Sequence, residues 1–370
     1  MSELTIVVAA FNRRHSLERC LRALLHAAYP GKVRLVISID HCETNGPVRE
    51  LAHQFVWPFG RKRVIAHEER LGLRNHIMKC GNLALRYGRI LLLEDDLFVS
   101  PDYYNYALQA VQYYEHDKRI AGISLYAPRF NESAKLPFEP LQGRYDVYFG
   151  QLPTSWGQIW TASQWAAYKA WYDNADNLLH KQWDKEALPR CVARWPESSW
   201  KKYYAKYMID ENKVFVYPYV SHSTNFGDVG THFRNRAHHF QVPLSNADKK
   251  QYVFDPYDRA SVVYDASFEN IGLGRLFERQ MRSQLTIDLY GTKQASRYSR
   301  YVLTTKPLDY RILGKFDLTM KPLEENIRHS IPGNSIFLYD TTVPRPFAAD
   351  SEPILLEQYF SWEKIKTRSQ

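Results

Sequence analysis

The chain has 370 residues, of which 45% are hydrophobic and 24% charged, a composition that excludes general disorder and allows one large domain or two. Lysine and arginine number 49 against 40 acidic residues. The formal net charge of +9 favours an anionic partner such as a nucleic acid, an acidic membrane surface or a phosphorylated substrate. The four cysteines are widely spaced and form no CxxC pair, which argues against a disulfide scaffold and a cysteine-based zinc site.

The start of the chain, MSELTIVVAAFNRR, predicts a strand followed by a basic turn and does not have the order of regions that marks a signal peptide. The longest apolar runs are far shorter than the roughly 18 residues that a membrane-spanning helix needs. We therefore expect a cytoplasmic protein.

Strands and helices are predicted to alternate along the first 126 residues. Apolar and β-branched runs predict strands over residues 4–10, 33–39, 64–66, 89–93 and 121–126. Apolar spacing of helical period predicts helices from Ser16 as N-cap, over 46–55, over 76–87 and over 101–119. This order predicts an α/β fold with a mostly parallel sheet, helices on both faces, and ligands at the carboxyl ends of the strands.

Beyond residue 126 the pattern becomes irregular, with a further strand predicted over 214–219 and short strands, broken by proline and glycine, over 285–290, 300–304 and 335–339. We expect a main domain over 1–240 with two halves, 1–126 and 127–240. A linker or helical segment would follow over 241–284. The last part, 285–370, is predicted to be a small β-rich appendage.

Three consecutive acidic residues, Glu94, Asp95 and Asp96, end the apolar strand ILLL. Crowded carboxylates repel one another unless a cation or protons offset their charge. A hard divalent ion, Mn²⁺ or Mg²⁺, prefers such oxygen ligands and could bridge to a diphosphate. The alternative is that Asp95 or Asp96 caps the next helical turn, and the acids alone do not decide between the two.

The run LLEDD, followed after four residues by PDYY, resembles the metal-binding motif of nucleotide-sugar glycosyltransferases of the GT-A fold. The blocks VVAAFNRRHSLERCL, VISIDHCE and HEERLGLRNHIMKCGNLAL resemble segments that precede this motif in those enzymes. The order comes closest to the eukaryotic N-acetylglucosaminyltransferase I family, with kinship to bacterial family-2-like transferases of surface polysaccharides. The resemblance covers residues 4–233 and implies a GT-A (Rossmann-like) fold. It also implies a metal-dependent, inverting hexosyl- or N-acetylhexosaminyltransferase.

Residue roles follow from the resemblance. The positions that match donor-binding positions are Ala10, Arg13, Asp40, Lys79, Glu94, Asp95, Trp156 and Gly157. Asp40 would accept a hydrogen bond from the uracil imide, which implies a UDP-sugar donor, and Arg13 would offset diphosphate charge. Asp96 would bind the metal directly, and His232 would complete the metal shell or contact the diphosphate. Each also has a structural interpretation: a solvated turn for Arg13, a loop cap for Asp40, a core residue for Trp156, and a surface loop residue for His232.

The catalytic base matches the family least well. An inverting transferase needs a carboxylate to take the proton from the acceptor hydroxyl, and in the family an aspartate directly precedes a tryptophan at the corresponding helix start. Here Ser199 precedes Trp200, so we predict that the nearest carboxylate, Glu197, is the base. Its alternative role is that of an acid in the first turn of a helix, and Asp184 and Asp228 are the next candidates.

The implied function is transfer of a sugar from a UDP-linked donor to a glycan or lipid-linked oligosaccharide in surface-polysaccharide synthesis. The basic stretches 234–250 and 290–311 would then contact the inner face of an anionic membrane. A GT-A-like nucleotidyltransferase is an alternative, but AAFNRRHS lacks the glycine-rich basic signature such enzymes carry after the first strand. A non-catalytic nucleic-acid-binding protein is another, but the basic residues are scattered rather than arranged in stripes with aromatics, so we expect no nucleic-acid partner.

Overall fold

The computed structural model describes residues 3–174, 183–185, 187–228, 240–246, 251–347 and 354–361. The chain divides into two compact units. The first takes in residues 1–128, 142–184 and 192–260, and the second takes in 129–141, 185–191 and 261–370. Within the described ranges, no helix is long and apolar enough to cross a membrane.

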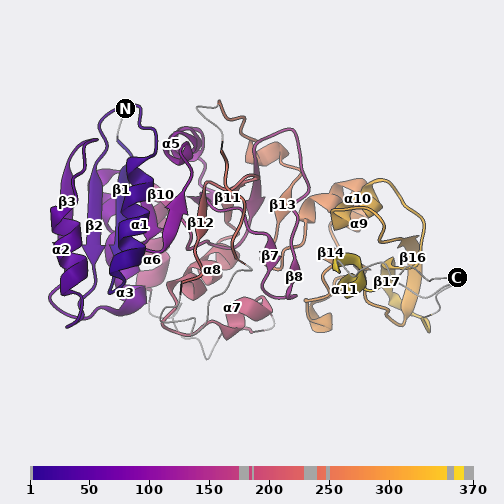
Figure 1. The fold of residues 1–370 in the computed structure, drawn as a ribbon. Coiled ribbons are helices and arrows are strands. Elements are labelled where there is room, and N and C mark those ends of the chain that lie inside the picture. The colour runs from indigo at the N-terminus through magenta and orange to yellow at the C-terminus, as the bar shows by residue number, and fades with distance from the viewer. Residues whose placement is uncertain are drawn as a thin grey trace, which may run out of the picture. The chain divides into compact units, whose positions relative to one another are not determined.

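A mixed sheet forms the centre of the first unit, with the strand order β9-β11-β6-β10-β4-β1-β2-β3 (Figure 1). The strands are β1 (Thr5–Ala10), β2 (Leu35–Ile39), β3 (Lys62–Ala66), β4 (Arg89–Glu94), β6 (Ile120–Ser124), β9 (Val147–Gly150), β10 (Gln158–Thr161) and β11 (Val214–Pro218). Strand β1 pairs in parallel with β2 and β4, and β2 pairs in parallel with β3. Strand β10 is antiparallel to both of its neighbours, β4 and β6.

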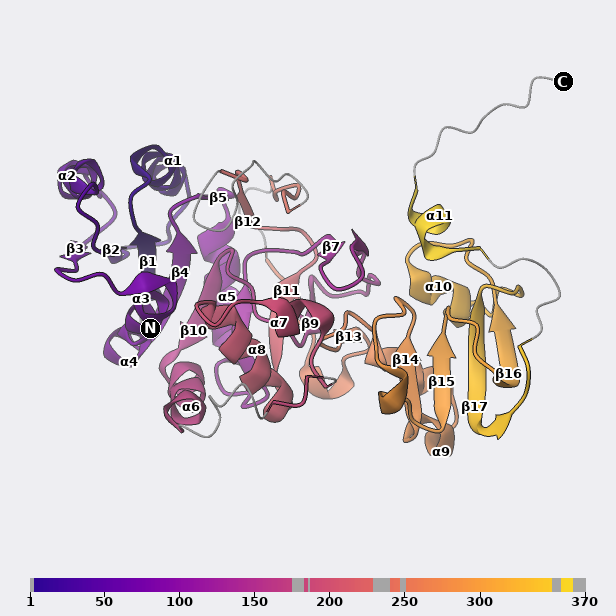
Figure 2. The same ribbon diagram turned by 90° about the horizontal axis from the view of Figure 1, so that it is seen from below.

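Helices cover this sheet on both faces. They are α1 (Arg14–Leu25), α2 (Gly46–Gln54), α3 (Gly72–Gly81), α4 (Leu83–Tyr87), α5 (Tyr103–Tyr114), α6 (Ala162–Asp173) and α8 (Trp200–Asp210). Figure 2 shows α1 and α2 on one side of β1, β2 and β3, and α3 and α4 on the other. Every residue of β1 and β2 is buried, as expected for parallel strands with helices against both faces. The predicted α/β class with a mostly parallel, GT-A-type sheet is confirmed.

Smaller elements complete the chain. A short antiparallel pair in the first unit joins β5 (Leu97–Val99) to β12 (Ser223–Asn225), and a 3₁₀ turn spans Tyr257–Arg259. Helix α7 (Arg190–Arg194) has residues in both units.

Two helix starts differ from the sequence prediction. The prediction that Ser16 caps the first helix is wrong: α1 begins at Arg14, and the Ser16 hydroxyl donates to Asp228 instead. The helix predicted over 76–87 begins earlier, at Gly72, and is divided into α3 and α4. Its start is stabilised by a carboxylate 31 positions earlier in the chain, Asp40, which apolar spacing cannot reveal.

The second unit contains a separate sheet with the order β14-β15-β17-β16, whose strands lie side by side in Figure 2. The strands are β14 (Leu285–Asp288), β15 (Tyr301–Thr304), β16 (Tyr310–Phe316) and β17 (Ile336–Pro344). Its other elements are β7 (Phe130–Asn131), β8 (Leu136–Pro137), β13 (Val263–Tyr264), α9 (Arg279–Arg282), α10 (Leu323–Arg328), α11 (Leu356–Phe360) and 3₁₀ turns over Ile271–Leu276 and Ala295–Arg297. The expected β-rich C-terminal region is therefore present, while the bounds 1–240, 241–284 and 285–370 stay a prediction.

A group of buried acidic residues stabilises the second unit. Asp288, at 0% exposure, accepts from the Lys293 amide (2.9 Å), the Tyr298 hydroxyl (2.7 Å) and the Lys306 ammonium (3.1 Å). The Lys293 ammonium donates to Asp265 Oδ2 at 2.5 Å. Because buried carboxylates are costly unless paired, these contacts stabilise the end of β14 against Lys293, Tyr298 and Lys306, which follow it in the chain.

Candidate functional site

The carboxyl ends of β2, β1 and β4 meet at one edge of the first-unit sheet. Ala10 is paired with Ile39, and Ala9 with Glu94, so the chain leaves the three neighbouring strands at the same level. The residues that follow the three strands therefore lie close to one another. This edge is where a parallel sheet places its ligand site.

Arg13 bridges two of the acids that end β4. Its Nη1 donates to Asp96 Oδ2 at 2.9 Å, and its Nη2 donates to Asp95 Oδ1. The Phe11 amide approaches Asp95 Oδ2 at 3.4 Å. Burial opposes the charge on Arg13, but the two carboxylates outweigh it and raise the pKa of the guanidinium. Arg13 is therefore a charged member of the acidic cluster rather than a solvated turn residue.

The three acids remain short of positive charge despite Arg13. Burial raises the pKa of Asp95 to about 6, against the opposing effect of Arg13. Burial and the neighbouring Asp96 also raise the pKa of Glu94, with Arg13 again opposing. A group of carboxylates that resists ionisation in this way is stabilised by any additional cation.

Asp96 has the one feature of the cluster that fits a metal ion. Its Oδ1 is buried and has no hydrogen-bond partner among the described residues, whereas Oδ2 accepts from Arg13. An oxygen of this kind suits Mn²⁺ or Mg²⁺, which complete their shells with water and phosphate oxygens. The described part of the chain holds no group of three or more His, Cys, Asp or Glu placed around a common point. The second predicted ligand, His232, lies outside the described residues.

The alternative role of Asp95 or Asp96 as a helix cap is wrong. The acids are followed directly by strand β5, and the next helix, α5, begins only at Tyr103. With no helix to cap, the cluster needs another explanation for its position at the ligand edge of the sheet.

Asp40 binds the start of α3. The side chain is 2% exposed, and its Oδ1 accepts from the amides of His41 (2.9 Å) and Leu71 (2.8 Å). Its Oδ2 accepts from the Gly72 amide at 3.0 Å and lies 3.3 Å from Arg70 Nη1. These contacts match the loop-cap interpretation, because a carboxylate stabilises the free amides of a helix N-terminus. A contact with uracil stays a prediction.

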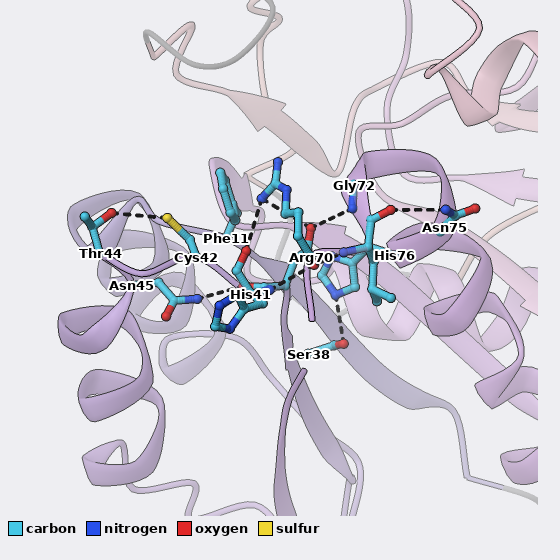
Figure 3. A network of polar contacts seen from close by, with 12 residues as sticks. Phe11, Ser38, His41, Cys42, Thr44, Asn45, Arg70, Gly72, Asn75 and His76 are labelled. Carbon is cyan, nitrogen blue, oxygen red and sulfur yellow. Dashed lines mark hydrogen bonds and ion pairs between the residues drawn. The ribbon is translucent and has the colours of Figure 1, made fainter. Parts of the chain in front are cut away.

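Aromatic and imidazole rings line the same end of β2 (Figure 3). The Arg70 guanidinium lies 3.6 Å from the centroid of the Phe11 ring. Below them, Ser38 Oγ contacts Nε2 of His76 at 2.9 Å and Nε2 of His67 at 3.2 Å. Burial lowers the pKa of His76 to about 4, so this imidazole is neutral at pH 7.

Lys79 acts on this region through its charge. It lowers the pKa of both His67 and His76, although burial is the larger cause for each, so its ammonium lies within electrostatic range of the rings. Ala10, the last residue of β1, is buried, and its carbonyl oxygen accepts a hydrogen bond from the Asp40 amide at 3.0 Å.

Trp156 and Gly157 enter the site from the turn before β10. Gly157 has a φ of +92°, and a Cβ there would come within 3.0 Å of Leu125, so glycine is required for two reasons. Trp156 is half-buried and packs on Tyr126 and Phe240, with ring centroids 4.6 and 4.9 Å apart.

Sequence reasoning missed Lys201. Its ammonium lies 5.3 Å from the Trp156 ring centroid and 4.4 Å from that of Trp195. It also lowers the pKa of Glu94, opposing the effect of burial, which places a second positive charge beside the acidic cluster. Lys201 belongs to the first turn of α8, and only its place in the chain next to the predicted base could have drawn attention to it.

The candidate bases lie in different surroundings. Glu197 is exposed, and its main-chain carbonyl accepts from Arg74 at 3.0 Å. Asp228 Oδ2 accepts from Ser16 at 2.9 Å and from Arg19, so its carboxylate is already engaged. Asp184 is exposed. Glu197 keeps its place as the predicted base.

Comparison with known proteins agrees with this geometry. Residues 5–158 match the family model described as Glycosyl transferase family 2, and no curated protein matches the chain. The matched range contains the acidic cluster and the strands β1, β2 and β4, and it confirms the resemblance to GT-A glycosyltransferases seen in the sequence.

Three solved structures illustrate what the chain is similar to. A mannosyltransferase from Pyrobaculum calidifontis, in complex with GDP-Man and Mn²⁺, is 16% identical, with a TM-score of 0.31 over 43% of this chain and 44% of that chain. TarS 1-349 of S. aureus is 11% identical, with a TM-score of 0.38 over 60% and 59%. GalNAc-T7, with UDP, GalNAc and Mn²⁺, is 12% identical, with a TM-score of 0.39 over 58% and 42%. The chain thus spans about half the length of these proteins.

Proposed function

We propose that the chain is a metal-dependent glycosyltransferase that moves a sugar from a nucleoside-diphosphate donor to an acceptor hydroxyl. The observation that supports this most directly is the unpartnered, buried Oδ1 of Asp96 in the acidic cluster at the end of β4. The cluster lies beside Arg13 and at the ligand edge of a domain that matches glycosyl transferase family 2. An Mn²⁺ or Mg²⁺ ion held by Asp96 would supply positive charge to the leaving diphosphate.

The donor would extend along the strand ends from β2 to β10. Its base would lie near Arg70 and Phe11, and we propose uracil as that base from the position of Asp40. Arg13 holds the carboxylates of Asp95 and Asp96 in place and would share their charge with the diphosphate. Lys79, on helix α3, whose start is bound by Asp40, would add to the positive potential on this side.

The sugar would lie against Trp156 and Gly157, near Glu94. Glu197 would take the proton from the acceptor hydroxyl as that oxygen forms its bond to the anomeric carbon. The bond between this carbon and the phosphate oxygen would break on the opposite side, and the diphosphate would leave with the electron pair. The product would have inverted configuration. We propose a hexosyl or N-acetylhexosaminyl donor and a glycan or lipid-linked oligosaccharide acceptor.

We also propose surface-polysaccharide synthesis at the cytoplasmic face of a membrane. The support is the net charge of +9 and the exposed Arg297 and Arg300 in the stretch 290–311. Of the other basic stretch, 234–250, only 240–246 belongs to the described residues. Sedimentation with anionic and neutral liposomes would test the contact, and equal partitioning into both would contradict it.

The function is tested by a donor panel. UDP-, GDP- and CDP-linked sugars are titrated with and without Mn²⁺, and binding is followed by thermal shift and by release of the nucleoside diphosphate. We expect stabilisation by a uridine nucleotide only when the metal is present. Preference for guanine would contradict the base assignment, and metal-independent binding would contradict the role of Asp96.

A further inference from the structure

We propose that Arg74 is a positioning residue that ties the segment bearing Glu197 to the nucleotide side of the site. The consequence for catalysis rests on the proposed function, because it requires Glu197 to act on an acceptor. The tie itself is a property of the fold and can be tested without any substrate.

Arg74 joins parts of the chain that are far apart in sequence. Its Nη1 donates to the carbonyl of Glu197 at 3.0 Å and to the hydroxyl of Tyr203, which are 123 and 129 positions away. The guanidinium also lies 4.8 Å from the centroid of the Tyr203 ring. Tyr203 is 1% exposed and belongs to α8, so one side chain of α3 holds both the start of α8 and the residues before it.

The end of α3 that carries Arg74 is itself fixed from the nucleotide side. Asp40 accepts from the amides of Leu71 and Gly72, which begin the helix two residues before Arg74. Gly72 has a φ of +74°, a conformation that other residues rarely adopt, so the turn into the helix has little freedom. Contacts therefore run without a break from the end of β2, through the start of α3, to Glu197.

The segment before α8, which contains Glu197, is held by a second hydrogen bond besides that of Arg74, and the two hydrogen bonds have different effects. The Lys202 ammonium donates to the carbonyl of Trp195 at 2.7 Å, which holds this segment to α8 itself. Loss of Arg74 would leave that internal tie in place and remove the tie to α3. The carboxylate of Glu197 also helps to raise the pKa of Tyr203, after burial and against Arg74, so it lies in the same neighbourhood.

The test is Arg74→Gln, with Arg144→Gln as the matched control. Arg144 also donates to a tyrosine hydroxyl, that of Tyr145 at 2.5 Å, and its guanidinium also lies 4.8 Å from the tyrosine ring centroid, away from the site. In the free protein, Arg74→Gln is expected to speed amide hydrogen exchange over 196–203 by about tenfold or more, while exchange in β1 and β2 is unchanged.

Catalysis gives the second measurement, with UDP, Mn²⁺ and UDP-GlcNAc hydrolysis as the probes. Arg74→Gln is expected to bind UDP as the parent does and to lower kcat roughly 10- to 100-fold at unchanged KM for the donor, because the base is misplaced. Arg74→Lys, which keeps one donor group and the charge, is expected to recover part of kcat.

Exchange and kcat equal to those of Arg144→Gln would overturn the inference. Joint loss of thermal stability, UDP binding and kcat would also overturn it, because Arg74 would then serve packing alone. If the parent protein binds no nucleoside diphosphate, the proposed function fails, while the exchange experiment still decides whether Arg74 positions the segment.

Discussion

Each unit holds three buried or half-buried acidic residues close together, and the two groups are balanced in different ways. The first-unit acids are Glu94, Asp95 and Asp96, and the second-unit acids are Asp265, Glu269 and Asp288. The second-unit acids are paired with two lysines, Lys293 and Lys306, and with main-chain amides. In the first unit, Arg13 bridges Asp95 and Asp96, and Lys201 acts on Glu94 through its charge, but one buried oxygen, Asp96 Oδ1, has no hydrogen-bond partner among the described residues.

The difference shows that crowded carboxylates do not by themselves indicate a ligand site. A buried carboxylate is stable when its oxygens accept hydrogen bonds, and Asp265, Glu269 and Asp288 each accept at least one within the fold. For the first-unit acids the balance is incomplete, and the incomplete part faces the ligand edge of a parallel sheet. Substitution in the first group should therefore affect binding, and substitution in the second group should affect stability.

The largest expected effect is on binding in the first group. Asp96→Asn should weaken metal-dependent UDP binding by more than about 100-fold while leaving the melting temperature nearly unchanged, because Asp96 Oδ1 has no hydrogen-bond partner among the described residues. Calorimetric titration of UDP with and without Mn²⁺, beside a melting curve, measures both. Parent-like binding by this variant would show that the metal is held elsewhere.

Asp288→Asn is the reciprocal experiment in the second group. The variant keeps the shape of the side chain but loses the charge that the Lys306 ammonium contacts at 3.1 Å. The free energy of unfolding should fall by about 2 kcal/mol, the scale of a hydrogen bond to a charged group. UDP binding should not change. Denaturant unfolding followed by fluorescence measures the free energy of unfolding. A loss of UDP binding without destabilisation would contradict the difference between the two groups of acids.

One buried group in each unit, His76 in the first and Glu269 in the second, should make stability depend on pH in opposite directions. Burial lowers the pKa of His76 in the first unit from 6.5 to about 4. Between these values the unfolded chain takes up a proton that the folded chain does not, so stability present above pH 6.5 is lost as the pH falls toward 4. The loss at pH 5 should be about 1 to 2 kcal/mol. His76→Gln should reduce this slope, and an unchanged profile would mean that His76 does not titrate as expected.

The smallest effect is expected at Glu269 in the second unit. Burial, with Asp288 nearby, raises the pKa of Glu269 well above its usual value. The folded chain then keeps a proton that the unfolded chain loses, so stability is greatest below pH 4.5 and declines as the pH rises through the folded pKa. Glu269→Gln should flatten this decline above neutrality. Steeper pH dependence in the variant would contradict the assignment.

Much of the first-unit sheet could be predicted from the sequence. The runs over 4–10, 33–39 and 89–93 are continuous and apolar, and such runs fit strands with helices on both faces, as β1, β2 and β4 are. The acids at the end of the third run were predicted to lie at the ligand edge for the same reason. These predictions depend only on residues that are neighbours along the chain, and for this reason they agree with the fold.

The partners of the charged groups depended on tertiary structure. Arg13 meets Asp95 across 82 positions, Asp40 binds the amide of Leu71 across 31, and Arg74 reaches Glu197 across 123. Residue type predicts that a buried carboxylate needs a donor, but not which donor the folded chain brings to it. The tertiary structure decides which strand ends adjoin and which helix starts beside them. As a result, Asp40 accepts hydrogen bonds from the chain itself, while Asp96 Oδ1 has no partner among the described residues. The physical reason is that hydrogen bonds are short and directional, so they form only where the folded sheet brings both groups together.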